Sequence, residues 1–177
     1  MLLGISGSLR KEATNRKLIR EAARLYGGPF TEADLALPLY DGDLERRDGI
    51  PARVIDLADQ IAAAEAVVIS SPEYNQSMSG VLKNALDWVS RTDRKPWLGK
   101  PVAIMAAAAG RAGGARSTYA LRLAMTPFRP RFSAGPEVLV AAAAQQFDAE
   151  GRLINEMNLR ALTEAMAILR TEAGAAA

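Results

Sequence analysis

One polar stretch combines the residue types that could bind a flat ligand with polar edges. Residues 70–88 read Ser-Ser-Pro-Glu-Tyr-Asn-Gln-Ser-Met-Ser-Gly-Val-Leu-Lys-Asn-Ala-Leu-Asp-Trp. An apolar run at 66–69 precedes this stretch, and an amphipathic segment begins near Ser79. The order predicts a strand, a loop and a helix, with the loop at the carboxyl end of the strand, where open α/β sheets bind ligands. Backbone amides, an aromatic ring and side-chain amides suit a flat ring better than a bond to be hydrolysed.

The composition limits what chemistry the side chains can do. The 177 residues include no cysteine and no histidine. This excludes disulfides, thiol or imidazole nucleophiles and zinc sites of the usual ligand set. It also removes the commonest acid–base group near neutral pH. If the protein is an enzyme, we therefore expect a bound cofactor to supply the chemistry, with no catalytic side chain and no metal.

Charge and hydropathy narrow the class of protein. The formal net charge is +2, too small to indicate a nucleic-acid partner. Apolar residues make up 49% of the chain, yet no apolar run reaches the roughly 18 residues of a membrane span. The first eight residues have no basic segment of the kind that opens a signal peptide. We therefore expect a cytoplasmic protein that binds neither membranes nor nucleic acid.

Apolar periodicity predicts strands that alternate with helices. Strands are expected near residues 2–5, 31–35, 66–70, 101–108 and within 131–140. Helices are expected near residues 15–26, 52–64, 79–90, 115–125 and 153–170. This alternation predicts an α/β protein with a doubly wound parallel sheet. One domain should span residues 1–172, followed by a frayed tail at 173–177.

The loop after the first strand is a second candidate site. It reads Gly-Ile-Ser-Gly-Ser-Leu-Arg over residues 4–10, and a helix follows. Small residues let backbone amides approach an anion, and a helix start adds partial positive charge. The loop lacks the endings of a P-loop and of a dinucleotide-binding fingerprint, and no convincing acidic residue ends the second strand. The terminal phosphate of a mononucleotide fits better; the alternative is a tight turn with an N-capping Ser or Thr.

Together these motifs resemble the NADPH-dependent FMN reductase family of flavodoxin-like proteins, and within it the bacterial quinone and chromate reductase group. The matching segments are Gly7–Lys11 with Asn15, Leu37–Asp41, Pro72–Asn75 with Ser77, Gly80–Trp88, Gly99–Val102 and Gly113–Arg116. The resemblance covers about residues 2–140. Its most specific part is the stretch from Pro-Glu-Tyr-Asn to Asp-Trp.

The resemblance implies a flavodoxin-like three-layer α/β/α fold, whose five-stranded parallel sheet has the order 2-1-3-4-5. It also implies FMN as the cofactor. The residues implied to contact FMN are Ser8, Arg10, Thr14 and Asn15 at the phosphate, and Pro72, Glu73, Tyr74, Asn75, Ser77, Gly110 and Gly113 along the ribityl chain and ring. Arg111 and Arg116 are candidates for binding NAD(P)H. A homodimer or homotetramer is a further expectation from the family.

The implied function is that of a flavin oxidoreductase. NADPH or NADH passes a hydride to bound FMN, and a quinone, a free flavin, an azo dye or chromate then takes the electrons. A flavodoxin-like one-electron carrier, a non-catalytic flavin-binding module and a nucleotide-binding protein without flavin are the alternatives. Carriers that dock on basic partners tend to be strongly acidic, which a net charge of +2 does not match.

The chain departs from the family pattern at three places. Ala13 stands where the family usually has a hydroxyl residue, so Thr14 would have to substitute for it. Met78-Ser79 replaces the family's x-Pro pair, and Ser79 is a good N-cap. The loop at 106–109 is all alanine where the family often has serines, so backbone amides from Gly110 onward would have to hold the flavin.

Several motif residues also have structural interpretations. Lys83 and Asp87 lie four apart and could form a helix-surface ion pair. Asn84 is expected to bond to the binding loop, and Trp88 to belong to the core or to an interface rather than to stack on a ligand. Glu73 is either a surface residue or a ligand contact, whereas ligand contact is favoured for Tyr74. For Arg116, a cofactor phosphate and a subunit interface remain equal alternatives. The wider arginine group is expected to be solvated surface and helix ends rather than the rim of an anion site: Arg111, Arg116, Arg122, Arg129 and Arg131.

Overall fold

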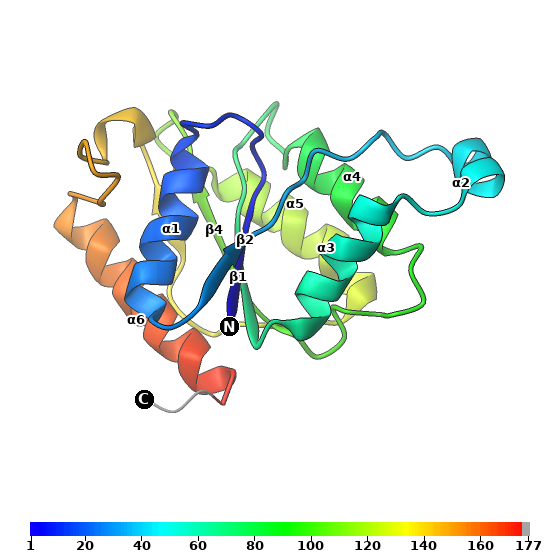
Figure 1. Ribbon diagram of the computed structural model, residues 1–177. Coiled ribbons are helices and arrows are strands. Elements are labelled where there is room, and N and C mark those ends of the chain that lie inside the picture. Colours follow the sequence, from blue (N-terminus) through cyan, green and yellow to red (C-terminus); the bar gives the residue numbers. More distant parts are fainter. Residues whose placement is uncertain (175–177) are drawn as a thin grey trace.

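The computed structural model describes residues 1–174 and places a parallel sheet between two layers of helices (Figure 1). The strands are β1 (Leu2–Ser6), β2 (Phe30–Glu32), β3 (Ala66–Ser70), β4 (Pro101–Ala107), β5 (Arg131–Phe132) and β6 (Val138–Val140). Their order is β2-β1-β3-β4-β5, and β6 also pairs with β4. The expected flavodoxin-like fold and strand order are therefore confirmed. Residues 175–177 of the expected frayed tail lie outside the described residues.

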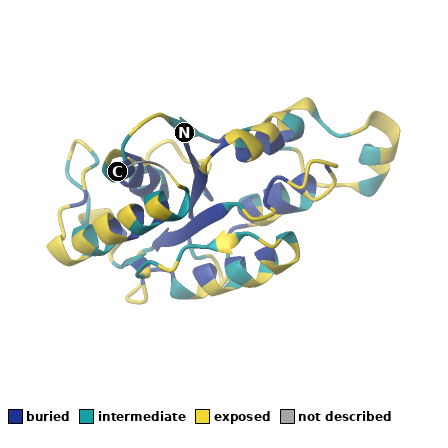
Figure 2. Cartoon of the chain, turned by 90° about the horizontal axis from the view of Figure 1, so that it is seen from below, coloured by how far each residue is buried: buried dark blue, intermediate teal, exposed yellow. Residues whose placement is uncertain are grey.

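The helices are α1 (Thr14–Tyr26), α2 (Gly42–Asp48), α3 (Ala52–Ala63), α4 (Gly80–Val89), α5 (Ala115–Met125) and α6 (Glu156–Glu172). Helices α1 and α6 pack on one face of the sheet, whereas α3, α4 and α5 pack on the other. Alternate strand residues serve the two cores, as Leu2 and Leu3 do. The central strands β1, β3 and β4 are accordingly buried throughout, while the outer faces of the helices are exposed (Figure 2). No helix within residues 1–174 is long and apolar enough to cross a membrane.

The fifth strand position is held by two short strands rather than by one. Phe132 pairs with Val102 of β4, and the pairing resumes only at Val138 opposite Met105. Between them, Gly135 lies against α6, where an added Cβ would be 3.1 Å from the Cα of Ala165. The residue after it is Pro136, which has no backbone N–H to donate to a neighbouring strand. The expected single strand within 131–140 is therefore interrupted.

Two helix predictions need correction. No helix was expected between the strand near 31–35 and the helix near 52–64, but α2 forms there as a short helix with no buried residue. Because it has no apolar face, no periodicity in the sequence marks it; the Asp41 side chain caps it by accepting from the N–H of Asp43 at 2.8 Å. The last helix begins at Glu156 rather than near Leu153, because the Asn155 side chain caps it and Leu153 forms a bridge with Phe147.

Glu21 of α1 is a buried carboxylate that joins α1 to the turn before α6. Its oxygens lie 2.8 Å from Nη2 of Arg24 and 3.3 Å from Nη1 of Arg152, and its side chain is 2% exposed. Burial raises the pKa of Glu21, but the hydrogen bonds and charges of the two arginines outweigh burial and hold this pKa below its ordinary value.

Replacing Glu21 with Gln is expected to lower the free energy of unfolding by about 1–2 kcal/mol at pH 7. A carboxylate with a lowered folded pKa stabilises the fold above its unfolded pKa, and this contribution is lost as the pH falls through the folded value. The difference between wild type and variant should therefore shrink below about pH 4. Urea unfolding at pH 7 and pH 3 measures this difference in the free energy of unfolding. The control is Glu12→Gln, which changes an exposed carboxylate. A difference that stays constant with pH would refute the assignment.

Candidate functional site

Three loops meet at the carboxyl edge of the sheet. They follow β1, β3 and β4, and hydrogen bonds join the first to the second. The N–H of Gly7 donates to the carbonyl of Ser70 at 2.8 Å, and Oγ of Ser79 donates to the carbonyl of Gly7 at 2.7 Å. A Cβ at Gly7 would lie 2.8 Å from Cδ of Pro72, so only glycine allows this approach. Ser79, which replaces a proline of the family pattern, thus both caps α4 and holds the first loop.

Asn15 lies beneath these loops rather than among the exposed groups. It is 3% exposed, and its amide bonds to the ends of two strands. Its Nδ2 donates to the carbonyl of Ala107 at 2.9 Å, and its Oδ1 accepts from the N–H of Ala107 at 3.0 Å. The same Oδ1 accepts from Oγ of Ser70 at 2.7 Å. The side chain therefore fixes the start of α1 against the ends of β3 and β4.

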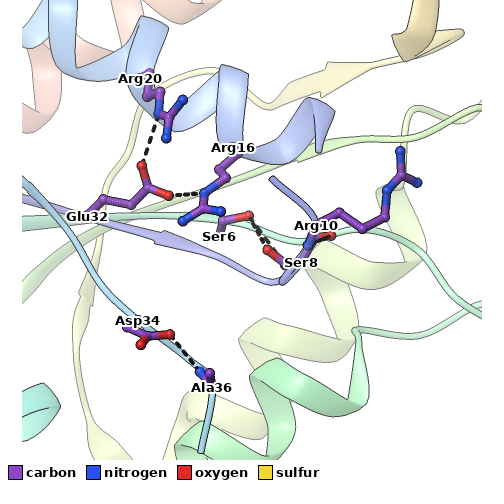
Figure 3. Close-up of polar contacts among 8 residues, drawn as sticks. All are labelled: Ser6, Ser8, Arg10, Arg16, Arg20, Glu32, Asp34 and Ala36. Atoms are coloured by element: carbon purple, nitrogen blue, oxygen red, sulfur yellow. Dashed lines mark hydrogen bonds and ion pairs between the residues drawn. The ribbon is translucent and has the colours of Figure 1, made fainter. Parts of the chain in front are cut away.

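Other polar groups of the first loop remain available. Among the described residues, Oγ of Ser8 makes only a long contact, accepting from the N–H of Arg10 at 3.4 Å. The Arg10 guanidinium is exposed, has no ion-pair partner within residues 1–174, and points away from Glu32 and Asp34 (Figure 3). At the N-cap of α1, Ala13 supplies no side-chain bond and the first turn contains no acidic residue. The arrangement is suited to an anion.

The end of β2 carries an acidic residue that the sequence did not reveal. Glu32 ends the strand, and its carboxylate accepts from Nε of Arg16 and, at 3.0 Å, from Nε of Arg20 (Figure 3). The expectation that no acidic residue ends this strand was wrong, because the strand was expected to run to Leu35. In a dinucleotide-binding fold this position holds a ribose. Here the guanidinium groups of Arg16 and Arg20 already bind the carboxylate of Glu32.

The loop after β3 ends in a tight hairpin that presents side chains to solvent. Tyr74 and Ser77 exchange two backbone hydrogen bonds, both 3.0 Å long. The two residues between them have left-handed backbones, with φ of 49° at Asn75 and 62° at Gln76, as in a two-residue type I′ turn. Tyr74 is 53% exposed, and Asn75 and Ser77 are also exposed. Pro72, by contrast, is buried at the base of the loop.

Glu73 connects the second loop to the third. Its carboxylate accepts from the backbone N–H of Arg116 at 3.0 Å and lies 3.5 Å from Nη1 of the same residue. Gly114, the N-cap of α5, has no side chain, so Glu73 provides the cap from another loop. Glu73 is half-buried and its carboxylate is already bonded to Arg116, so it is not a freely solvated surface residue.

A hollow of about 350 Å³ lies between these loops. Its lining residues are Glu73, Ala108, Ala109, Gly110, Arg111, Ala112, Gly114 and Arg116. Gly110 is exposed and opens into space, whereas Gly113 packs against β6, where a Cβ would be 2.7 Å from the carbonyl of Leu139. Arg111 is exposed and has no ion-pair partner among the described residues. The predicted residues thus separate into available groups and groups that hold the loops in place.

Comparison with known proteins identifies the family. The sequence model of the NADPH-dependent FMN reductases matches residues 1–146. The chain belongs to the NADPH-dependent FMN reductase family. Membership confirms the expected oxidoreductase class, with FMN as cofactor and NAD(P)H as co-substrate.

Relatives match this chain over most of its length. An NAD(P)H-dependent FMN reductase of Pseudomonas aeruginosa is 44% identical over 158 residues, which cover 88% of this chain and 85% of the relative. A quinone reductase of Escherichia coli is 38% identical over 162 residues, which cover 89% of this chain and 86% of the relative. Among solved structures, the chain superposes on FerB, a flavoenzyme NAD(P)H:acceptor oxidoreductase from Paracoccus denitrificans, with a TM-score of 0.87 at 29% identity. The superposition covers 98% of this chain and 96% of FerB.

The motif residues of α4 hold the 37–41 loop. Nδ2 of Asn84 and Nε1 of Trp88 both donate to the carbonyl of Pro38, at 2.9 and 2.8 Å. Oδ1 of Asn84 accepts from the N–H of Tyr40 at 2.8 Å, and the rings of Tyr40 and Trp88 pack in a T-shaped arrangement with their centroids 5.0 Å apart. Trp88 is fully buried, as expected of a core residue. Asn84 does make structural hydrogen bonds, as expected, but the expected partner was wrong: it holds the 37–41 loop and not one of the three loops that meet at the sheet edge.

The helix-surface ion pair expected on α4 is also present. Nζ of Lys83 lies 2.7 Å from Oδ1 of Asp87, with both side chains partly exposed. Such a pair contributes only about 0.3–0.5 kcal/mol in water. Lys83 and Asp87 therefore belong to the helix surface rather than to the reaction site.

Proposed function

We propose that this protein is an NAD(P)H-dependent FMN and quinone reductase whose flavin lies along the carboxyl edge of the sheet. The observation that carries the proposal is that the polar residues of the loops fall into two groups, one already bonded and one available. Buried polar groups bind one another and fix the backbone, whereas Ser8, Arg10, Asn75 and Arg111 remain available to a ligand. This is the arrangement required of a preformed cofactor site.

The first loop fits the phosphate of FMN. Ser8, Arg10 and Thr14 would hold it together with the N–H groups at the start of α1, where no acidic side chain competes. Ala13 contributes no hydroxyl, so Thr14 is the substitute for the family's residue. Asn15 would position this loop instead of touching the phosphate, because both ends of its amide are occupied.

The second and third loops fit the remainder of the flavin. Pro72, Tyr74, Asn75 and Ser77 would line one side of it, with Gly110 and the hollow beyond on the other. Glu73 and Gly113 would keep these loops at a fixed separation. Bound FMN supplies the electron-transfer chemistry, which no side chain of this histidine- and cysteine-free protein provides.

Arg111 is the better candidate for the phosphate that distinguishes NADPH from NADH. Arg116 is already hydrogen-bonded and paired with Glu73, whereas the guanidinium of Arg111 has no such partner within residues 1–174. Quinones are the favoured acceptors because the Escherichia coli relative is a quinone reductase. Free flavin, azo dyes and chromate as acceptors, a cytoplasmic location and a homodimer or homotetramer remain predictions.

Steady-state oxidation of NADPH and NADH by FMN-loaded protein, with benzoquinone as acceptor, tests the proposal. Turnover that requires FMN is expected. Arg111→Ala should lower kcat/KM for NADPH about tenfold, through KM, and leave the value for NADH unchanged, because one charge-assisted contact is lost. Arg160→Ala, which removes an exposed arginine on α6, is the control. Protein that ignores added FMN, or that binds it without turnover, would contradict the function.

A further inference from the structure

A second hollow, of about 200 Å³, lies at the opposite edge of the sheet. Its lining residues are Val89, Ser90, Thr92, Lys95, Pro96, Trp97, Leu98, Pro127, Phe128 and Arg129. They lie at or after the carboxyl ends of α4 and α5, before the starts of β4 and β5 respectively. In a parallel α/β sheet that edge is the one away from the flavin loops. This hollow is therefore separate from the proposed flavin site.

Among residues 1–174, two cations and no acidic residue line this hollow. Lys95 and Arg129 are both exposed, and neither side chain has an ion pair or hydrogen bond with another residue between 1 and 174. Most arginines of α1, α2 and α3 are paired, for example Arg16, Arg46 and Arg53. Two unpaired cations lining the same hollow favour an anionic ligand.

The backbone at both cations is unusual. Lys95 has φ of 45° and Arg129 has φ of 53°, both in the left-handed region that favours glycine or asparagine. Each such residue is strained, and strain of this kind gathers at ligand sites. The N–H of Gly99 donates to the carbonyl of Arg129 at 3.0 Å, and the N–H of Leu98 donates to that of Lys95 at 3.1 Å. The first bond joins the two strained segments, and the second closes the turn at Lys95.

The walls between the cations are apolar and aromatic. Trp97 is 3% exposed and Phe128 is half-buried, with Pro96, Leu98 and Pro127 beside them. The indole N–H of Trp97 has neither solvent contact nor a partner among the described residues, so its placement is not explained by its own hydrogen bonding. Pockets for drug-sized ligands occupy about 300–1,000 Å³, so this hollow suits a single ring.

We propose that this hollow binds a small planar carboxylate. Its ring would lie against the aromatic and proline walls, and its carboxylate would pair with Lys95 and Arg129. Such a site would bind acidic aromatic molecules independently of FMN.

Benzoate is the probe, and the two tryptophans report on it. The protein has only Trp88 and Trp97, so a ¹⁵N spectrum contains two indole N–H signals. Trp97→Phe identifies its own signal by removing it. In the presence of excess FMN, benzoate should shift the Trp97 signal saturably. The Trp88 signal should stay in place, because that indole is bonded to the carbonyl of Pro38. Absence of a saturable Trp97 shift, or equal shifts of both signals, would overturn the proposal.

Variants separate the site from general charge attraction. Lys95→Asn with Arg129→Asn removes both cations and keeps residues that tolerate a left-handed backbone, so folding should be preserved. The benzoate Kd should rise at least tenfold while NAD(P)H oxidation stays unchanged. Lys17→Gln with Arg160→Gln removes two exposed or half-exposed cations elsewhere and should leave the Kd unaltered. The neutral isostere benzamide should bind at least tenfold more weakly than benzoate. Equal affinity of the two probes, or an unchanged Kd in the Asn variant, would refute an anion site.

Discussion

Replacing Asn15 with Asp is expected to destabilise the protein strongly at pH 7.5 and only weakly near pH 4. A protonated Asp could reproduce all three bonds, because it can donate to the carbonyl of Ala107 as the amide does at 2.9 Å. An ionised Asp would be buried with one oxygen facing that carbonyl. Both effects favour the protonated form, so the folded pKa of the new carboxyl should lie above its ordinary value of about 3.9.

The sign of the pH dependence follows from that raised pKa. A carboxyl with a raised folded pKa stabilises the fold below its unfolded pKa, and the contribution is lost as the pH rises through the folded value. We expect the variant to be less stable than wild type by about 3 kcal/mol at pH 7.5, the usual effect of an uncompensated buried charge. Urea unfolding of both proteins at the two pH values measures the difference.

A matched substitution on α6 serves as the control. The Asn155 side chain acts as an N-cap and accepts from the N–H of Asn158 at 3.0 Å. Because Asp is an equally good N-cap, Asn155→Asp should leave stability unchanged at both pH values. Equal losses at pH 4 and pH 7.5 in the Asn15 variant would show that the amide N–H does not matter. FMN affinity at pH 7.5 should fall with stability in this variant only, since Asn15 supports the first and third loops.

Replacing Arg10 with Ala is expected to weaken FMN binding about 10- to 100-fold, the usual effect of losing one charge-assisted hydrogen bond. The guanidinium is exposed and unpaired within residues 1–174, so its removal should leave stability unchanged. Quenching of FMN fluorescence on binding gives the Kd. The effect should shrink at high salt, because the contact is ionic and exposed.

Two controls make the Arg10 result specific to the phosphate. Riboflavin, which lacks the phosphate, should bind wild type and Arg10→Ala equally. Lys11→Ala removes a neighbouring exposed cation and should change the FMN Kd by less than about threefold, as expected for general screening. If both ligands lost affinity alike, Arg10 would act on the loop and not on the phosphate.

The sheet could be predicted from the sequence because its signals are local. Buried parallel strands appear as short apolar runs, as at Ala66–Ser70, and the prediction there matches the structure residue for residue. Helix α2 gave no such signal, because none of its residues is buried. The split between β5 and β6 depends on how closely Gly135 approaches α6, and no periodicity encodes that contact.

The candidate site could be predicted in part. Exposed groups such as Arg10 and Asn75 were selected by residue type and position in a loop, and the structure leaves them available. The polar side chains that are already hydrogen-bonded within the protein were harder to predict. Asn15 bonds to residues 55 and 92 positions away, and Glu73 caps a helix 43 positions away. Their residue types suit a ligand or a structural bond equally well, and only tertiary contacts decide between the two.

The interrupted outer strand also affects how molecules of this enzyme meet one another. Unpaired edges of sheets can recruit strands from other chains, which leads to aggregation. Here β5 offers two residues and β6 three, with Pro136 between them. At the other edge, β2 has three residues and follows Pro29. A foreign strand could therefore form only a few hydrogen bonds at either edge, so neither edge favours the addition of a strand from another molecule.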